Sequence, residues 1–168
     1  QVIRGENTME LAEIGKNILT NCMNVKPGEN VLIVTDDEKY AIGQALYQAA
    51  KLLKAEAMLM TMPAREVSGQ EPPAVVAAAM KAADVVICPM KTSITHTRAK
   101  IEAAEAGARI ATMPGITEEM FAMGAMTADY SRVMALTEQV TDLLTNANTA
   151  RIEKDGHVLT LDLRGRRG

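Results

Sequence analysis

Aromatic residues are scarce in this sequence, which has no tryptophan, one phenylalanine and three tyrosines. Proteins that bind single-stranded nucleic acid stack its bases on aromatic side chains and carry a positively charged surface. This chain has neither property, because its formal net charge at pH 7 is −3. We therefore expect no nucleic acid among its partners.

Long hydrophobic runs and closely spaced cysteines are also missing. No apolar stretch reaches the roughly 18 residues of a membrane-spanning helix, so we expect no membrane partner. Cys22 and Cys88 each stand alone in an apolar segment. That placement is typical of buried free thiols and argues against a disulfide or a metal site. No secretory signal pattern opens the chain, and we expect a cytoplasmic protein.

Apolar residues make up 48% of the chain and charged residues 23%, which suits a globular protein with a substantial core. Short β-branched or apolar runs alternate with segments of helical periodicity. The predicted strands are 30–35, 57–62, 84–88 and 108–112, and the predicted helices are 9–23, 42–53, 74–83, 95–106, 117–123 and 129–146. This alternation favours an α/β fold, a doubly wound and mostly parallel sheet with helices on both faces.

Helix capping sets several of these expected boundaries. Thr8 is expected to cap the first helix. Thr35 and Glu38 have the spacing of a capping box ahead of the second. Gly107 suits the left-handed position that ends helix 95–106.

The last 20 residues change character. Asp155-Gly156 lies between two strand-like runs and predicts a β-hairpin with a type I′ turn. A lone hairpin with an apolar stripe is marginal in water, so we expect it to pack against a second copy or against protein outside this chain. The stripe consists of Leu159, Leu161 and Leu163, and helix 129–146 has its own apolar face of Val133, Leu136, Val140, Leu143 and Leu144. The sequence thus divides into a Rossmann-like α/β N-terminal domain (8–148) and a hairpin that begins a truncated C-terminal domain (149–168).

Ligands of an open α/β sheet bind beyond the carboxyl ends of its strands. The densest polar cluster of the sequence follows the third predicted strand, and an acidic pair follows the first. We expect these side chains to line a substrate cleft or a domain interface. The candidates are Asp36, Asp37, Thr92, Ser93, Thr95, His96 and Arg98.

Each candidate also has a simpler interpretation. Asp36 and Asp37 could bind a ribose hydroxyl, a metal or a substrate amine, but helix capping explains them as well and is favoured. The hydroxyl groups are ordinary helix caps, and Arg98 suits a solvated helix face. His96 and His157 are too far apart to indicate a metal site, and Ser93 with His96 lacks the acidic third member of a hydrolase triad. The residues alone predict no catalytic group and no metal ligand.

Several strings of this sequence resemble the aminopeptidase T family, the thermophilic metallo-aminopeptidases of leucyl aminopeptidase type. The similarity begins near residue 9. The 2,5-dihydroxypyridine dioxygenases, which use non-haem iron, are similar in the same region. The matching strings are Val25-Lys26-Pro27-Gly28-Glu29, Val31-Leu32-Ile33-Val34, Gln70-Glu71-Pro72-Pro73, Thr95-His96-Thr97-Arg98-Ala99, the run from Glu105 to Thr117, and Thr127-Ala128-Asp129-Tyr130.

The aminopeptidase resemblance implies a hydrolase that releases N-terminal residues from peptides with a two-metal site of zinc, cobalt or a similar divalent ion. In that family the metal ligands lie in the following domain. The resemblance therefore implies that this chain binds no cofactor itself, is inactive alone, and has the missing C-terminal domain as its partner in a homo-oligomer. Two alternatives are the N-terminal domain of the iron dioxygenase and a free-standing module for ligand binding or self-association.

Overall fold

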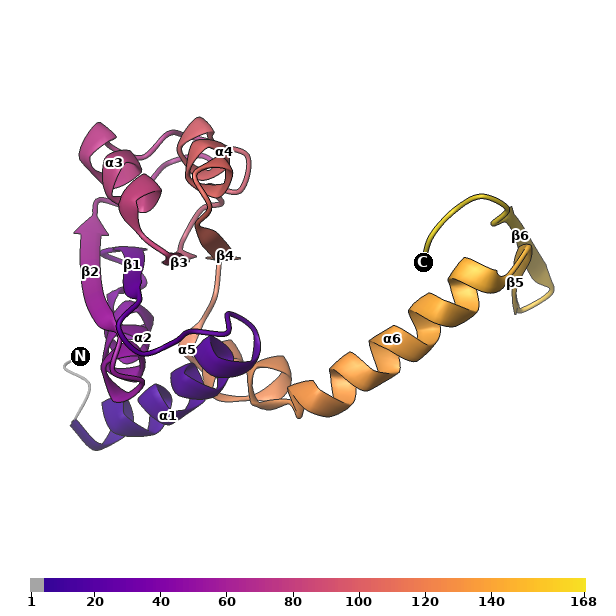
Figure 1. The fold of residues 1–168 in the computed structure, drawn as a ribbon, viewed down its shortest axis with the longest axis horizontal. Helices are drawn as coiled ribbons and strands as arrows, with labels where there is room; N and C mark the ends of the chain where they lie inside the picture. Colours follow the sequence, from indigo (N-terminus) through magenta and orange to yellow (C-terminus); the bar gives the residue numbers. More distant parts are fainter. Residues whose placement is uncertain (1–4) are drawn as a thin grey trace. The chain divides into compact units, whose positions relative to one another are not determined.

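The computed structural model of the chain describes residues 5–168, with side chains from Glu10 onward. The chain forms two compact units, which divide between Thr127 and Ala128. The first contains a four-stranded sheet with its helices, and the second contains one long helix and a two-stranded hairpin (Figure 1).

The sheet of the first unit is parallel, and its strands follow the order β2-β1-β3-β4. Its strands are β1 (Asn30–Asp36), β2 (Glu56–Met62), β3 (Val85–Met90) and β4 (Arg109–Pro114). The central strands β1 and β3 are buried on both faces, as their continuous apolar runs predict. After β2 the chain returns past β1 to form β3, so the strand order reverses between β1 and β3. A reversal of this kind is where doubly wound folds open a ligand crevice.

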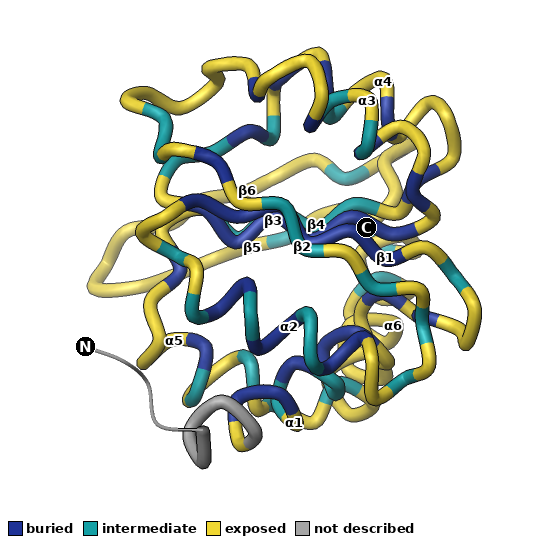
Figure 2. Tube along the Cα trace, turned by 90° about the vertical axis from the view of Figure 1, so that its left-hand side faces the viewer, coloured by how far each residue is buried: buried dark blue, intermediate teal, exposed yellow. Residues whose placement is uncertain are grey.

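Helices cover both faces of this sheet. One face packs against α1 (Gly5–Asn21), α2 (Tyr40–Leu52), α5 (Glu118–Ala122) and the short 3₁₀ helix η1 (Gly124–Thr127). The other face packs against α3 (Ala74–Ala82) and α4 (Arg98–Glu105). Each face of the sheet has its own hydrophobic core. Alternate residues of β1 pack into these two cores, since Ile33 lies in the first and Leu32 in the second. Figure 2 shows the buried residues concentrated along the central strands. The predicted doubly wound α/β fold is confirmed.

Three predicted helix starts are wrong. The helix α1 begins at Gly5, ahead of Thr8, whose side chain lies outside the described ones. The capping box expected ahead of α2 does not form, because the Thr35 hydroxyl donates to the Pro89 carbonyl at 2.9 Å, and the helix begins at Tyr40 without a side-chain cap. The helix α4 begins at Arg98, since it is Thr97 whose side chain caps it. At α2 a tertiary contact thus replaces the local cap that the sequence suggested, whereas α4 keeps a local cap at a neighbouring residue.

The second unit consists of α6 (Tyr130–Asn146), β5 (Thr149–Lys154) and β6 (His157–Asp162). Asp129 caps α6 by accepting a hydrogen bond from the Arg132 N–H at 3.1 Å. The predicted hairpin is confirmed, because Asp155 and Gly156 have φ values of 49° and 78°, positive as a type I′ turn requires. No residue of this unit is buried, and most of its large apolar side chains are exposed.

Two further expectations concern the burial of the cysteines and membrane-spanning helices. Cys88 is buried as predicted, but Cys22 is exposed, because it follows the last turn of α1 rather than pointing into the core. Within residues 5–168, no helix is both long enough and apolar enough to cross a membrane.

Candidate functional site

The carboxyl end of β1 is closed by the side chain of Asp36. Its Oδ1 accepts hydrogen bonds from the backbone N–H groups of Glu38 at 3.1 Å and Lys39 at 3.0 Å. Its Oδ2 accepts from the backbone N–H of Lys91 at 2.6 Å. Asp36 is fully buried, and both of its oxygens are engaged. The carboxylate therefore holds the end of β1 to the loop after β3 and has little capacity left for a ligand.

Asp37 makes the corresponding contact on the other side of β1. Its Oδ1 accepts a hydrogen bond at 3.0 Å from the backbone N–H of Ala64, which lies in the loop after β2. The two neighbouring aspartates thus fasten the loops on either side of β1. Residues 63–73 are called the β2–α3 loop below, and residues 91–97 the β3–α4 loop.

The β2–α3 loop is also bonded directly to the β3–α4 loop. The backbone N–H of Gly69 donates to the Ser93 carbonyl at 2.8 Å, and the Ser93 N–H donates to the Ser68 hydroxyl at 3.2 Å. Farther along, the Glu71 carboxylate accepts from the backbone N–H groups of Arg98 at 2.6 Å and Ala99 at 3.2 Å. Glu71 therefore caps the start of α4 from a distant loop, a role that no local sequence pattern indicates.

Three of the four hydroxyl groups of the β3–α4 loop are hydrogen-bonded. Ser93 Oγ donates to Thr95 Oγ1 at 2.9 Å, and Thr95 Oγ1 lies 2.9 Å from Thr112 Oγ1 at β4. Thr97 Oγ1 donates to the Ile94 carbonyl at 2.7 Å and accepts from the Lys100 N–H at 3.3 Å. These hydroxyls rigidify the edge of the sheet and tie the loop to β4.

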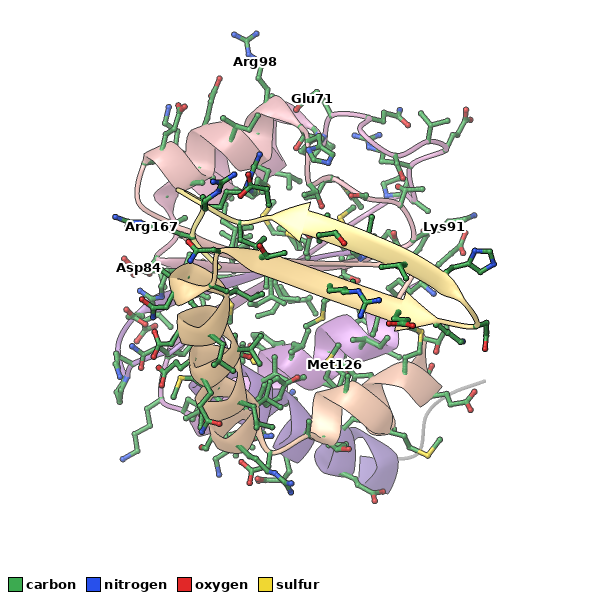
Figure 3. All side chains as sticks on the ribbon, turned by 90° about the vertical axis from the view of Figure 1, so that its right-hand side faces the viewer. Glu71, Asp84, Lys91, Arg98, Met126 and Arg167 are labelled. Carbon is green, nitrogen blue, oxygen red and sulfur yellow. The ribbon has the colours of Figure 1, made fainter. Side chains whose placement is uncertain are left out.

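Three charged or titratable side chains of this loop and the first turn of α4 face solvent. His96 is exposed, and the Arg98 side chain is 85% exposed and contacts Glu102 at 3.7 Å. Figure 3 shows Arg98 extending away from the ribbon. Lys91 pairs with Glu38, with 2.6 Å between Nζ and Oε1, and this hydrogen bond raises the pKa of the Lys91 ammonium. The polar cluster that the sequence predicts thus consists of hydroxyl groups that face the protein and charged side chains that face solvent.

Two atoms at this edge have no hydrogen-bond partner. They are Arg65 Nε and Thr92 Oγ1, both buried. Thr92 was among the sequence candidates, whereas Arg65 was not. Its only sequence signal is a basic residue shortly after a strand, at the edge where the other candidates gather.

Metal ligands are not grouped in the part of the chain that the structure describes. No three side chains among histidine, cysteine, aspartate and glutamate approach closely enough there to hold an ion. A non-haem iron site needs such a group, usually two histidines and a carboxylate. His96 and His157 belong to different units, and both aspartates after β1 are engaged by backbone N–H groups. These residues do not fit an iron centre.

Among the described residues, one cavity adjoins the carboxyl edge of the sheet and another runs along β2. One of about 170 Å³ adjoins the carboxyl edge and is lined by Glu38, Lys39, Ala41, Ile42, Ile116, Thr117 and Glu118. Another, of about 720 Å³, runs along β2 between Tyr47 and the alanines of α3. The second is mostly apolar and lacks the convergent polar groups of a catalytic pocket.

Comparison with known proteins identifies the family. Residues 10–167 match the model of the family NicX, 2,5-dihydroxypyridine 5,6-dioxygenase. The structure of 2,5-dihydroxypyridine dioxygenase from Pseudomonas putida KT2440 is similar, with a TM-score of 0.60 and 19% identity over 90% of this chain and 46% of that chain. The present chain thus spans about half the length of that enzyme.

A chorismate mutase/shikimate 5-dehydrogenase fusion protein from Clostridium acetobutylicum has a TM-score of 0.42 and 13% identity over 80% of this chain and 60% of that chain. No protein of curated function matches the sequence.

The family match overturns the assignment to aminopeptidase T, and with it the expected hydrolase and metalloprotease activity. The most specific string behind that assignment, Glu105 to Thr117, forms the end of α4, the strand β4 and the turn before α5. The string therefore covers a strand and its two connections, and a likeness there indicates a shared fold. The chain belongs to the 2,5-dihydroxypyridine 5,6-dioxygenase family.

Proposed function

We propose that this chain is one half of a dioxygenase that opens the ring of a dihydroxylated pyridine. The match of residues 10–167 to the family model carries this proposal. As the family name states, the reaction acts at ring carbons 5 and 6. Both atoms of O₂ enter the product, so the reaction needs no separate reductant.

In the proposed enzyme the iron is held by residues outside this chain. The described residues contain no cluster of metal ligands, and the similar dioxygenase is about twice as long as this chain. The chain itself contributes a fixed side of the substrate cleft. The carboxyl edge of its sheet is fixed by the contacts of Asp36, Asp37 and Glu71 described above.

The second unit has an exposed apolar face, which supports the proposal that another part of the enzyme covers it. Val133, Leu136, Val140 and Leu143 of α6 are between 46% and 71% exposed, and Leu159 of β6 is 53% exposed. An apolar surface of this kind is unusual on a free protein and marks an interaction site. The proposed occupant is the remaining half of the enzyme, because the similar dioxygenase has more than half of its length beyond the matched part.

Oxygen uptake tests the function. The gene product that contains this sequence is loaded with ferrous iron and mixed with 2,5-dihydroxypyridine in an oxygen electrode. The 168-residue chain, treated in the same way, is the control. We expect one O₂ consumed per substrate by the longer protein and none by the chain alone. An iron-loaded longer protein that leaves dihydroxylated pyridines unoxidised would contradict the proposal, as would stoichiometric iron in the chain alone.

A further inference from the structure

The two edge strands of the four-stranded sheet differ in how well they are protected against pairing with another chain. The strand β2 forms one edge and β4 the other (Figure 1). β4 has a charged residue, Arg109, at its start and Pro114, which lacks a backbone N–H, at its end. Charges and prolines of this kind keep an edge strand from adding a further strand. The stretch 57–62 of β2 contains neither a proline nor a charged residue.

The outer edge of β2 also presents open backbone groups. The Glu56 N–H donates to the Glu29 carbonyl at 2.9 Å, so Glu56 points its backbone groups toward β1. Successive residues of a strand point their N–H and C=O groups to opposite edges. Ala57, Leu59 and Thr61 therefore point theirs outward, where the described sheet has no further strand. These groups can pair with a strand from outside the sheet.

Apolar side chains flank this open edge on both faces of the sheet. A groove of about 720 Å³ runs along β2 from Tyr47 of α2 to Ala79 and Ala82 of α3. Met58 lines this groove and is 42% exposed. Val75, one helical turn before Ala79, is 71% exposed. The groove thus suits a strand with apolar side chains, and the alanines allow its backbone to come close.

A second copy of β2 fits this edge when the two strands run antiparallel about a two-fold axis at Leu59. Leu59 then lies opposite Leu59 of the second copy, and Ala57 lies opposite Thr61 on either side of the axis. All of these residues point their backbone groups outward, so each opposed pair can exchange two hydrogen bonds. Glu56 lies opposite Met62, so no like charges face each other.

Neighbouring registers are less favourable. The axis must lie level with a residue of β2, because opposed side chains share a face of the sheet. Moving it to the next residue would place Ala57 opposite Pro63, which has no N–H to donate. Moving it to the preceding residue would place Thr61 opposite Ala55, whose N–H already donates to the Ala50 carbonyl at 3.1 Å. The open groups of β2 therefore complement β2 itself in one register.

We propose that two copies of this protein pair through β2 in this register and join their sheets into one. The helices α2 of both copies lie on one face of the joined sheet, and the helices α3 lie on the other. Met58 and Met60 of each copy fill the groove of the other. The pairing is independent of the proposed dioxygenase activity, because it uses only the edge of the sheet.

Engineered cysteines test the register in the gene product that contains this sequence. Met58→Cys and Met60→Cys, each with Cys22→Ser, are produced separately and also co-expressed, and all samples are then oxidised. Met58 lies opposite Met60 of the second copy at a Cα separation of about 4.5 Å, which a disulfide can span. The two Met58 positions are diagonal, about 7–8 Å apart, which is too far. We expect a covalent dimer that contains one chain of each variant only from the co-expressed pair, and its absence would overturn the proposal.

A proline variant tests the contribution of the edge to assembly. The Thr61 N–H points away from β1 and its side chain is exposed, so Thr61→Pro removes an outward donor while the contacts with β1 and the core remain. We expect light scattering to give half the mass of the unaltered protein, with a circular dichroism spectrum that shows the fold intact. Thr61→Val, which keeps the N–H, is the matched control and should keep the full mass. A monomeric unaltered protein, or an unchanged mass in folded Thr61→Pro, would contradict the pairing.

Hydrogen exchange distinguishes a second copy from a segment of the same polypeptide. We expect the Leu59 amide to exchange slowly in the assembled protein and rapidly in Thr61→Pro, while the Met58 amide, which faces β1, stays slow in both. Slow exchange of the Leu59 amide in a monomeric protein would show that another part of the same polypeptide covers β2, and would overturn the proposal.

Discussion

The Asp36 carboxylate accepts a hydrogen bond from the backbone N–H of Lys91, 55 residues away, at a distance of 2.6 Å. This contact spans the place where a doubly wound sheet usually opens to its ligand. A buried side chain thus occupies the crevice between β1 and β3. A ligand that approaches this edge meets the loops on either side of Asp36, rather than the carboxylate itself.

Replacing Asp36 should therefore destabilise the fold. Asp36→Ala leaves the N–H groups of Glu38 and Lys91 without their acceptor, whereas the Lys39 N–H keeps the Asp36 carbonyl, and we expect a loss of about 3 kcal/mol in the free energy of unfolding. Urea denaturation followed by circular dichroism measures this loss. Asp37→Ala is the matched control, since it removes one hydrogen bond at an exposed residue and should cost about 1 kcal/mol. Equal losses would show that Asp36 does not join β1 to β3.

Gly43 determines how closely α2 approaches the end of β1. A Cβ atom at this position would lie 2.8 Å from Thr35 Cγ2 and 3.0 Å from Thr35 Cβ. Gly43→Ala should lower the free energy of unfolding by about 1–3 kcal/mol through overpacking, despite the better helix propensity of alanine. Thr35→Ser removes the nearest methyl group, so the double variant should recover part of the loss. Denaturation midpoints of the two single variants and the double variant measure this coupling.

The elements that sequence predicted well are those specified locally. The run Val31 to Val34 is apolar throughout and rich in β-branched residues, which suits a strand buried on both faces. Asp155-Gly156 specifies its turn through positive φ values that few other residue pairs adopt. These elements keep their predicted type because no distant contact competes with the local preference.

The features that sequence missed depend on partners far along the chain. Thr35 has the local pattern of a helix cap, yet its hydroxyl donates to Pro89, 54 residues away. Glu71 caps α4 from 27 residues upstream. The loop that carries Arg65 is joined to the loop of Thr92 by the hydrogen bond between Ser68 and Ser93, which are 25 residues apart. Such pairings require the strand order, which periodicity alone does not determine.

The two cysteines should react very differently. Cys22 is exposed, while burial raises the pKa of the Cys88 thiol to about 12, so almost none of it is thiolate at pH 8. We expect Ellman's reagent to modify one thiol per native chain within minutes, and the second only in denaturant. Cys22→Ser should leave the native chain unreactive. Rapid reaction of two thiols in the native chain would contradict the burial of Cys88.

An ion pair at the opposite edge of the sheet should make stability depend on acid pH. The Arg109 guanidinium donates to Glu29 Oε2 at 2.7 Å, and together with the Lys26 backbone N–H it holds the pKa of the Glu29 carboxyl below its ordinary value of 4.5. Since the folded chain then binds fewer protons than the unfolded one, the stabilisation is complete above pH 4.5 and is lost as the pH falls through the folded-state pKa. The pair is partly exposed, so its contribution at pH 7 should stay below about 1 kcal/mol.

Glu29→Gln tests this relationship because it removes the titrating group and keeps a side chain of similar size. We expect the variant to be slightly less stable than the unaltered chain at pH 7, and the difference to shrink between pH 4.5 and pH 3. The comparison is made by urea denaturation at several pH values, with Glu105→Gln, an exposed position at the end of α4, as the control. A difference between Glu29→Gln and the unaltered chain that stays constant down to pH 3 would mean that Arg109 does not lower the pKa of Glu29. The contact would then only position Arg109, whose Nε–H donates to the Met23 carbonyl at 3.0 Å and so joins β4 to the segment after α1.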